Sequence, residues 1–339
     1  RGLGDVYKRQ EVRALTNKQP PFEINERIMA DVIEIAELVG RVSVTDKISM
    51  NPTLRRTNRI QTIYSSLAIE QNTLDIEQVT AVLSGKRVIA SPKDIAEVQN
   101  AYEIYDNMDK LNPYSIDDLL KAHSVMERGL LNEAGEFRSR PVGVADSEGN
   151  ILHFGTLPQY VPNLIQELLE WTEKSEIHLL IKSCVFHYEF ELIHPFADGN
   201  GRMGRLWHTL LLSKWNPIFA WLPIESIIHD NQSEYYNAIN VSNNNGNSTV
   251  FIEFMLSVIK QALQESINDK PKNTSSKSDL RWNKINDYLE THEYILNSDV
   301  QKLLGVSSAT ATRILVGFMK DDKLKRIRIC LLYTSPSPR

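Results

Sequence analysis

Residues 191–212 read ELIHPFADGNGRMGRLWHTLLL, and this stretch decides the fold because a short polar loop joins two apolar segments. Gly199 and Gly201 flank Asn200 within the loop. Glycines free the backbone to turn its N–H groups toward one point, and the beginning of a helix attracts anions. The sequence therefore predicts a helix-loop-helix unit with a phosphate-binding site where the second helix begins.

The charged residues of this stretch suit a metal-bound polyphosphate. Arg202 and Arg205 are three residues apart on the first turn, where guanidinium groups can hold phosphate oxygens with paired hydrogen bonds. Asp198 offers a hard oxygen ligand for Mg²⁺. His194 has a side-chain pKa suited to removing a hydroxyl proton near neutral pH. Each residue alone also has a purely structural interpretation, and only their combination favours a nucleotide site.

Apolar residues recur with helical spacing over most of the chain. We expect helices over residues 23–44, 58–70, 76–83, 92–108, 115–130, 161–174, 176–192, 201–214 and 249–267. One stretch breaks the pattern, because residues 141–144 and 151–154 flank DSEGN, a segment whose residues favour tight turns. The sequence therefore predicts an all-α fold with one short β-hairpin.

The C-terminal part has a different organisation. Residues 268–279 are polar and predict a linker, and residues 280–329 show three short apolar helices followed by one alternating strand. This order is typical of a winged helix-turn-helix whose last strand is missing. Binding of DNA through residues 297–319 stays open beside target docking and self-association, because Arg313 is the only basic residue of the candidate recognition helix before Lys320.

The composition is that of an ordinary globular protein. Of 339 residues, 42% are hydrophobic and 24% are charged, enough for one large core and a small second domain. No apolar run is long enough to span a bilayer and no secretory signal is apparent, so we expect a cytoplasmic protein without a membrane partner. The two cysteines, Cys184 and Cys330, cannot form a disulfide framework, and neither has a partner at metal-ligand spacing.

The two ends do not resemble the rest of the chain. DVYKRQ at residues 5–10 and CLLYTS at residues 330–335 can be encoded by nearly reverse-complementary DNA that resembles a transposon end used in preparing sequencing libraries. We therefore expect residues 1–10 and 330–339 to be adapter-derived tails. Without their four cations and one anion, the formal net charge falls from −5 to −8, which argues against a broad surface for nonspecific nucleic-acid binding.

The complete loop pattern fills every defined position of the signature His-x-Phe-x-Asp/Glu-Gly-Asn-Gly-Arg-x-x-Arg. The chain thereby resembles the Fic family of protein adenylyltransferases over about residues 25–265. The resemblance implies a Fic-type helical bundle with an N-terminal helical region at 11–110 and a catalytic core at 111–267. It also implies transfer of AMP from ATP to a Ser, Thr or Tyr hydroxyl of a target protein, with Mg²⁺ as the metal.

The resemblance assigns a role to each matching position. His194 would be the general base and Asp198 the magnesium ligand. The nucleotide would be held by residues of the loop and the helix that follows it, together with one residue near the adenine: Gly199, Asn200, Gly201, Arg202, Met203, Gly204, Arg205 and Asn243. Asn243 falls in an asparagine-rich segment that we expect to be a loop. Phe196 and Arg138 would be structural anchors.

Two further segments match the family. The hairpin at 141–154 would be a flap that aligns the target by strand pairing. Ser66 and Glu70 lie one helical turn apart, and the resemblance implies an inhibitory helix whose Glu70 pairs with Arg205 and keeps the γ-phosphate out of its productive position. Gln71 stands where the family usually has Gly or Asn.

Several alternatives stay open. The same site could remove AMP, with Glu70 orienting a water molecule. A different class of function is a nucleotide-responsive DNA-binding regulator that acts through residues 297–319. The target protein, its hydroxyl residue and a homo-oligomeric state are not determined by the sequence.

Overall fold

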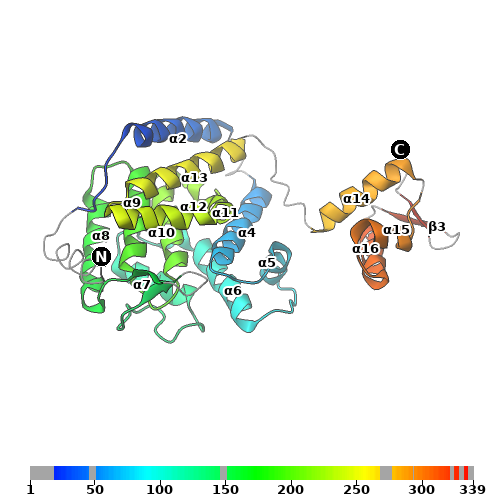
Figure 1. Cartoon of the computed structure of the whole chain (residues 1–339), viewed down its shortest axis with the longest axis horizontal. Helices are drawn as coiled ribbons and strands as arrows, with labels where there is room; N and C mark the ends of the chain where they lie inside the picture. The colour runs from blue at the N-terminus through cyan, green and yellow to red at the C-terminus, as the bar shows by residue number, and fades with distance from the viewer. Residues whose placement is uncertain are drawn as a thin grey trace. The chain divides into compact units, whose positions relative to one another are not determined.

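The computed structural model describes residues 19–45, 51–145, 151–267, 277–292, 294–320, 324–327 and 332–334. The chain divides into two compact units, residues 1–269 and residues 270–339 (Figure 1). Among the described residues, no helix has the length and apolar character needed to cross a membrane. The predicted all-α class is confirmed for the larger unit, whose only described strands form one short hairpin.

The described residues of the larger unit form α-helices of 7 to 20 residues and three short 3-10 turns. The α-helices are α2 (Glu26–Thr45), α4 (Pro52–Ile69), α5 (Ile76–Leu83), α6 (Pro92–Asp106), α7 (Ile116–Met126), α8 (Val161–Lys174), α9 (Leu179–Ile193), α10 (Asn200–Trp215), α11 (Ile224–Asp230), α12 (Gln232–Asn245) and α13 (Thr249–Ile267). The 3-10 turns are η1 (Met108–Lys110), η2 (Pro158–Tyr160) and η3 (Pro217–Ala220).

Helices α9 and α10 form the centre of this unit (Figure 1). Both are buried around most of their circumference; α9 is apolar on most sides, whereas α10 also buries Arg202, Arg205 and His208. One apolar cluster packs α9 against α2, α11, α12 and α13, and a second packs α9 and α10 against α4 to α8. The polar loop between α9 and α10 is therefore held between two rigid, fully packed helices.

Local capping sets where several helices begin. Asn51 accepts hydrogen bonds from the amides of Thr53 and Leu54, and Pro52 occupies the first helical position, so α4 begins six residues before the expected position at 58. Asp75 and Gln78 form a reciprocal capping box at α5, whose predicted bounds are confirmed. The bounds predicted for the helices at 161–174 and 249–267 are also confirmed.

The expected asparagine-rich loop around residue 243 is wrong, because residues 232–245 form α12. Asparagine has a low helix propensity, but Tyr235, Ala238 and Ser242 recur at helical spacing and are buried against the core. Burial of this face outweighs the weak local preference. Gly246 then ends the helix in a left-handed conformation, with φ of 70°.

The predicted hairpin is confirmed as two antiparallel strands, β1 (Gly143–Ala145) and β2 (Ile151–Phe154). Gly143 pairs with Phe154 and Ala145 pairs with Ile151, with a bulge between Val144 and Ala145. The predicted turn at 146–150 lies outside the described residues.

The smaller unit contains α14 (Lys277–Thr291), α15 (Asn297–Leu304), α16 (Ser308–Lys320), β3 (Lys325–Ile327) and β4 (Leu332–Thr334). Its core gathers Ile285, Ile295, Val300, Leu315 and Phe318. The unit boundary falls inside the predicted linker, although α14 already begins at residue 277.

The expectation that the last strand of the smaller unit is missing is wrong, because β3 pairs with β4 in an antiparallel sheet. Strand β4 lies inside the segment that we expect to be adapter-derived. Strand pairing uses backbone groups, so an edge strand can accept any extended segment with suitable residues. Assignment of this unit to the winged helix-turn-helix fold stays a prediction.

Candidate active site

Two residues in the left-handed region shape the loop between α9 and α10. His194 follows the last residue of α9 with φ of 54° and ψ of 64°, and its amide still donates to the carbonyl of Phe190. Gly199 has φ of 80° and directly precedes the first residue of α10. A histidine in this region is uncommon and costs conformational free energy, which the packed helices on both sides must offset.

The loop is locked by its own side chains. The amide side chain of Asn200 is buried, accepts from the Phe196 amide at 2.9 Å and donates to the Phe196 carbonyl at 2.9 Å. Phe196 is fully buried and stacks on the His123 ring at a centroid distance of 3.7 Å, so the predicted anchoring role of Phe196 is confirmed. The structure gives Asn200 a part in loop geometry, and its contact with the nucleotide stays a prediction.

His123 fixes the loop from the side of α7. Its Nδ1 accepts from the Gly135 amide at 2.9 Å, so its Nε2 donates to the Asp198 carbonyl at 3.1 Å. Burial lowers the pKa of His123 to about 4, which keeps the ring neutral. Within the described residues, no group of three His, Cys, Asp or Glu side chains could hold a metal ion.

Arg138 joins the segments that flank the hairpin to the loop between α9 and α10. Its guanidinium donates to the carbonyls of His194 at 2.6 Å, Ile193 at 3.3 Å, Arg140 at 2.9 Å and also Thr156. The amide of Arg138 donates to the carbonyl of Pro195. The predicted structural role of Arg138 is confirmed, because one buried cation holds carbonyls on both sides of His194.

Arg205 points toward α4 and meets both residues that the sequence singles out there. Its Nε donates to Ser66 Oγ at 3.0 Å, and its Nη2 donates to the Ser66 carbonyl at 2.9 Å and to Glu70 Oε1 at 2.8 Å. The Arg205 side chain is 1% exposed, whereas that of Glu70 is 36% exposed. The predicted Glu70–Arg205 ion pair is therefore present.

Glu70 also covers the beginning of α10. A Cβ atom at Gly201 would collide with Glu70 Oε1, so the carboxylate rests directly on the Gly201 backbone. The first amides of a helix lack partners within the helix and favour an anion. Glu70 thus places a carboxylate where the sequence predicts a phosphate.

Arg202 points to a different set of carboxylates. Its guanidinium lies 3.1 Å from Glu127, 3.6 Å from Glu97 and 3.6 Å from Asp198. Burial raises the pKa of Glu127 to about 7, with contributions from Asp198 and Glu97 and an opposing effect of Arg202. Arg202 and Arg205 therefore do not converge on one point in this structure, although both lie on the first turns of α10.

Met203 and Gly204 have packing roles in the structure. Met203 is fully buried in the core, and its amide donates to the carbonyl of Gly199. A Cβ atom at Gly204 would lie 2.8 Å from Glu191 Oε1 and 3.0 Å from the His187 ring. Direct contact of Met203 and Gly204 with a nucleotide stays a prediction, and their buried positions do not favour it.

A pocket of about 110 Å³ opens where α4, α9, α10 and α12 meet. Among the residues that line it are His194, Gly201, Arg205, Tyr236 and Asn243. Asn243 lies on the last turn of α12 and accepts a hydrogen bond from the Tyr188 hydroxyl at 2.9 Å. The fold thus brings the predicted base, part of the anion cradle, one arginine and the predicted adenine contact to one cavity.

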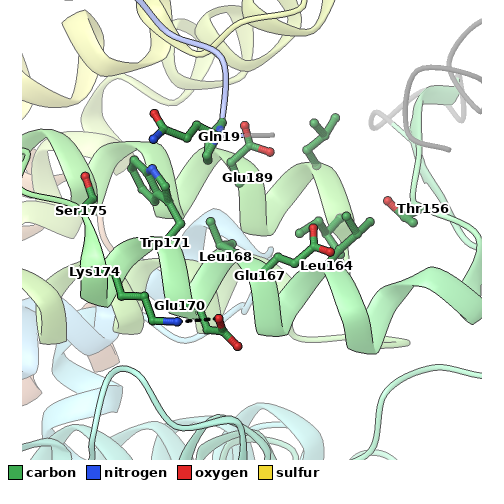
Figure 2. A pocket seen from close by; sticks show the side chains of 13 residues that line it. Gln19, Thr156, Leu164, Glu167, Leu168, Glu170, Trp171, Lys174, Ser175 and Glu189 are labelled. Atoms are coloured by element: carbon green, nitrogen blue, oxygen red, sulfur yellow. Dashed lines mark hydrogen bonds and ion pairs between the residues drawn. The ribbon is translucent and has the colours of Figure 1, made fainter. Parts of the chain in front are cut away.

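A larger groove of about 310 Å³ lies elsewhere, along α8 and α9 (Figure 2). Leu164, Leu168 and Trp171 of α8 line it, and Thr156 lies at the opposite end from Ser175 (Figure 2). Leu192 lines both this groove and the smaller pocket. The smaller pocket is the better candidate for chemistry, because His194, Gly201 and Arg205 of the signature line it together with Glu70.

Sequence reasoning missed several residues of the site. Glu97 and Glu127 meet Arg202 from α6 and α7, and Tyr236 and Glu191 line the pocket. Glu191 could have been noticed, because it lies three residues before His194, on the last turn of α9. Glu97 and Glu127 lie far from the loop in the sequence and at no regular spacing from it, so only the tertiary fold shows that they contact Arg202.

Comparison with known proteins agrees with this geometry. The Fic/DOC family pattern matches residues 113–212. The chain is 29% identical over 220 residues to protein adenylyltransferase fic-1 of Caenorhabditis elegans, covering 60% of this chain and 40% of the relative. It is 28% identical over 265 residues to protein adenylyltransferase Fic of Drosophila willistoni, covering 74% of this chain and 50% of the relative. The chain therefore spans half or less of the length of these two relatives.

A solved structure gives the more extensive match. The crystal structure of a Fic family protein from Desulfovibrio desulfuricans is 39% identical, covers 95% of this chain and 99% of its own chain, and superposes with a TM-score of 0.73. This similarity extends over nearly the full length of both chains, and three signature residues, His194, Gly201 and Arg205, line one pocket. The chain belongs to the Fic/DOC family.

Proposed function

We propose that the chain transfers AMP from ATP to a hydroxyl side chain of a target protein. The observation that carries the proposal is the convergence of His194, Gly201, Arg205 and Asn243 on one pocket. Asn243 and Tyr236 would contact the adenine, and the phosphates would extend past His194 toward the beginning of α10. Arg205 would then bind the outer phosphates with the guanidinium that now holds Glu70.

The chemistry follows from this placement. The target hydroxyl oxygen forms a bond with the α-phosphorus of ATP, and the bond between that phosphorus and the oxygen bridging to the β-phosphate breaks. His194 accepts the hydroxyl proton, and pyrophosphate leaves with the displaced electron pair. Catalysis would rest on positioning and on neutralisation of charge by the α10 amides and Arg205.

We further propose that Asp198 holds Mg²⁺ together with substrate phosphates. The Asp198 side chain is 62% exposed at the edge of the loop, and its Oδ1 accepts from the Gly199 amide at 2.7 Å. One accessible carboxylate suits Mg²⁺, which usually keeps several waters and takes its remaining ligands from phosphates. The metal would neutralise phosphate charge; Asp198 would hold it, and the Gly199 amide keeps the Asp198 carboxylate beside the cradle.

Glu70 would inhibit this reaction. Its carboxylate occupies Arg205 and rests on Gly201, so a triphosphate in the productive position would meet both a negative charge and an occupied arginine. Productive binding thus requires Glu70 to leave. The 36% exposure of its side chain makes that movement feasible without unfolding of α4.

The hairpin of β1 and β2 would align the target. Its two strands precede Gly155, at which an added Cβ would lie 3.2 Å from the Cβ of His194, so the hairpin leads directly to the catalytic loop. An extended target segment could pair with a free strand edge and bring its hydroxyl to His194. Binding of DNA by residues 297–319 stays a prediction.

The test uses ATP labelled separately at the α- and the γ-phosphate. The Glu70→Gly protein with Mg²⁺ is expected to incorporate the α-label into itself or a target and to leave the γ-label in solution. The matched Glu70→Gly/His194→Ala protein is expected to incorporate neither. Incorporation of the γ-label would instead indicate phosphoryl transfer and would contradict the proposal.

A further inference from the structure

Glu191 lines the same pocket as His194 and Glu70, although neither the signature nor the proposed reaction uses it. It is on the last turn of α9, lines the pocket and has a side chain that is 13% exposed. Its Oε1 atom is buried and has no hydrogen-bond partner. A buried carboxyl oxygen without a donor is costly, so such a group usually has a role beyond packing.

Glu191 approaches His194 with two groups. The backbone carbonyl of Glu191 lies 3.4 Å from His194 Nδ1, and its carboxylate Oε2 lies 4.0 Å from the same nitrogen. This arrangement favours the tautomer with the proton on Nδ1, which leaves Nε2 as the basic nitrogen. The carboxylate is close enough to favour a positive charge on the imidazole.

Residues of α9, α10 and α12 surround the carboxyl group of Glu191. Gly204 on α10 has no side chain, and a Cβ there would lie 2.8 Å from Glu191 Oε1. On α9 itself, His187 Nε2 lies 4.0 Å from Oε1 and also bonds with the Tyr235 hydroxyl at 3.1 Å. The position is therefore enclosed by α9, α10 and α12.

The charged and titratable groups that face Glu191 come from four helices. Burial raises its pKa to about 8, the charge of Glu70 on α4 adds to this effect, and Arg205 on α10 opposes it. Burial keeps the pKa of His187 well below its ordinary value, and burial together with Glu191 raises that of Tyr235 on α12, so both neighbours are neutral near pH 7. Departure of Glu70 removes one cause that disfavours the ionised form of Glu191.

We infer that Glu191 is a positioning residue for the proposed transfer: its carboxylate orients the imidazole of His194 and stabilises the positive charge that His194 acquires on taking the hydroxyl proton. This inference rests on the proposed function. It also gives Glu70 a second effect, because departure of its carboxylate frees Arg205 for phosphate and removes one of the two causes, the other being burial, that disfavour the ionised form of Glu191. Loss of Glu70 would then activate the enzyme in two ways, by letting the triphosphate take its productive position and by making His194 a better base.

The variant Glu191→Gln tests the charge, because it keeps the shape of the side chain and loses the carboxylate. In the Glu70→Gly background we expect kcat to fall about tenfold, while KM for ATP changes by less than about twofold. The acid limb of the pH–rate profile should move down by about one pH unit, since the base loses its neighbouring negative charge. Glu173→Gln, at an exposed position of α8, is the matched control and should change neither quantity.

A second measurement does not depend on activity. NMR titration of histidine-labelled protein without nucleotide should show the pKa of His194 lower by about one unit in Glu70→Gly/Glu191→Gln than in Glu70→Gly. Glu191→Asp keeps the negative charge, so in this variant the pKa of His194 should stay close to its value in Glu70→Gly. An unchanged His194 titration in the glutamine variant, or equal behaviour of the aspartate and glutamine variants, would overturn the inference. Failure of Glu70→Gly to label would instead refute the proposed function and leave the titration as the test.

Discussion

Glu70→Gly is the perturbation whose effect the structure predicts most directly. The variant removes one charged hydrogen bond of 2.8 Å to Arg205 and the carboxylate that rests on Gly201. A hydrogen bond to a charged group contributes about 1.5–3 kcal/mol, and the 36% exposure of Glu70 places this one toward the lower end. Loss of an inhibitory interaction of about 2 kcal/mol corresponds to an approximately 30-fold gain in the population of molecules that hold ATP in the productive position.

The assay compares initial rates of labelling from α-labelled ATP for the native chain, Glu70→Gly and Glu70→Gln. We expect about a 30-fold increase for glycine and a smaller one for glutamine, which keeps a weaker neutral contact with Arg205. Glu77→Gln, at an exposed position of α5, is the control and should behave like the native chain.

The same variant makes a prediction for stability. Arg205 is 1% exposed, so without Glu70 its charge is balanced less well and the unfolding temperature should fall. ATP with Mg²⁺ should restore it, because the triphosphate would supply the missing negative charge, and the stabilisation by ATP should be larger than in the native chain. Equal labelling rates and equal stabilisation by ATP in native and Glu70→Gly proteins would refute the reasoning.

Four further outcomes follow from the local geometry. Gln71 has φ of 66°, a left-handed conformation that strains any residue except glycine. Gln71→Gly should therefore raise the free energy of unfolding by up to about 1 kcal/mol in chemical denaturation, and a lower free energy of unfolding would show that no strain is present. Arg138→Lys should lose about 3 kcal/mol in the same assay and most of the labelling, because an ammonium cannot reach four carbonyls; native stability would contradict this. His194→Gly should abolish labelling and be more stable than His194→Ala, since residue 194 has φ of 54°. Burial raises the pKa of Glu127 from its ordinary 4.5 to about 7. The contribution of protonated Glu127 to the free energy of unfolding is therefore full below pH 4.5 and is lost as the pH rises through 7. Glu127→Gln should flatten this decline when unfolding is measured against pH without metal, and an unchanged decline would contradict the assignment.

The sequence predicted the centre of the fold because the information there is local. An apolar helix, a loop with glycine on both sides of Asn200 and a second apolar helix are readable from periodicity and turn chemistry alone. The pairing of Glu70 with Arg205 was also predictable, although only through resemblance to a family. The structure adds the reason that Gly201 must lack a side chain, which is the carboxylate above it.

The remaining parts of the site depend on tertiary packing. Residues 232–245 form a helix because Tyr235 and Ala238 are buried, and their asparagine content alone indicates a loop. Arg202 is directed by Glu97 and Glu127, which come from two other helices and have no sequence relation to the loop. The side chain of Asn200 binds the backbone N–H and C=O of Phe196, because these buried groups need an acceptor and a donor, and the sequence pattern gives no sign of this contact.

Intact-mass spectrometry of the Glu70→Gly protein after incubation with ATP and Mg²⁺ tests the central claim most directly, because it identifies the group that is transferred. The account predicts a mass increase equal to one or more AMP groups, absent from the Glu70→Gly/His194→Ala protein under the same conditions. An increase equal to phosphate, or an AMP increase that persists without His194, would contradict it.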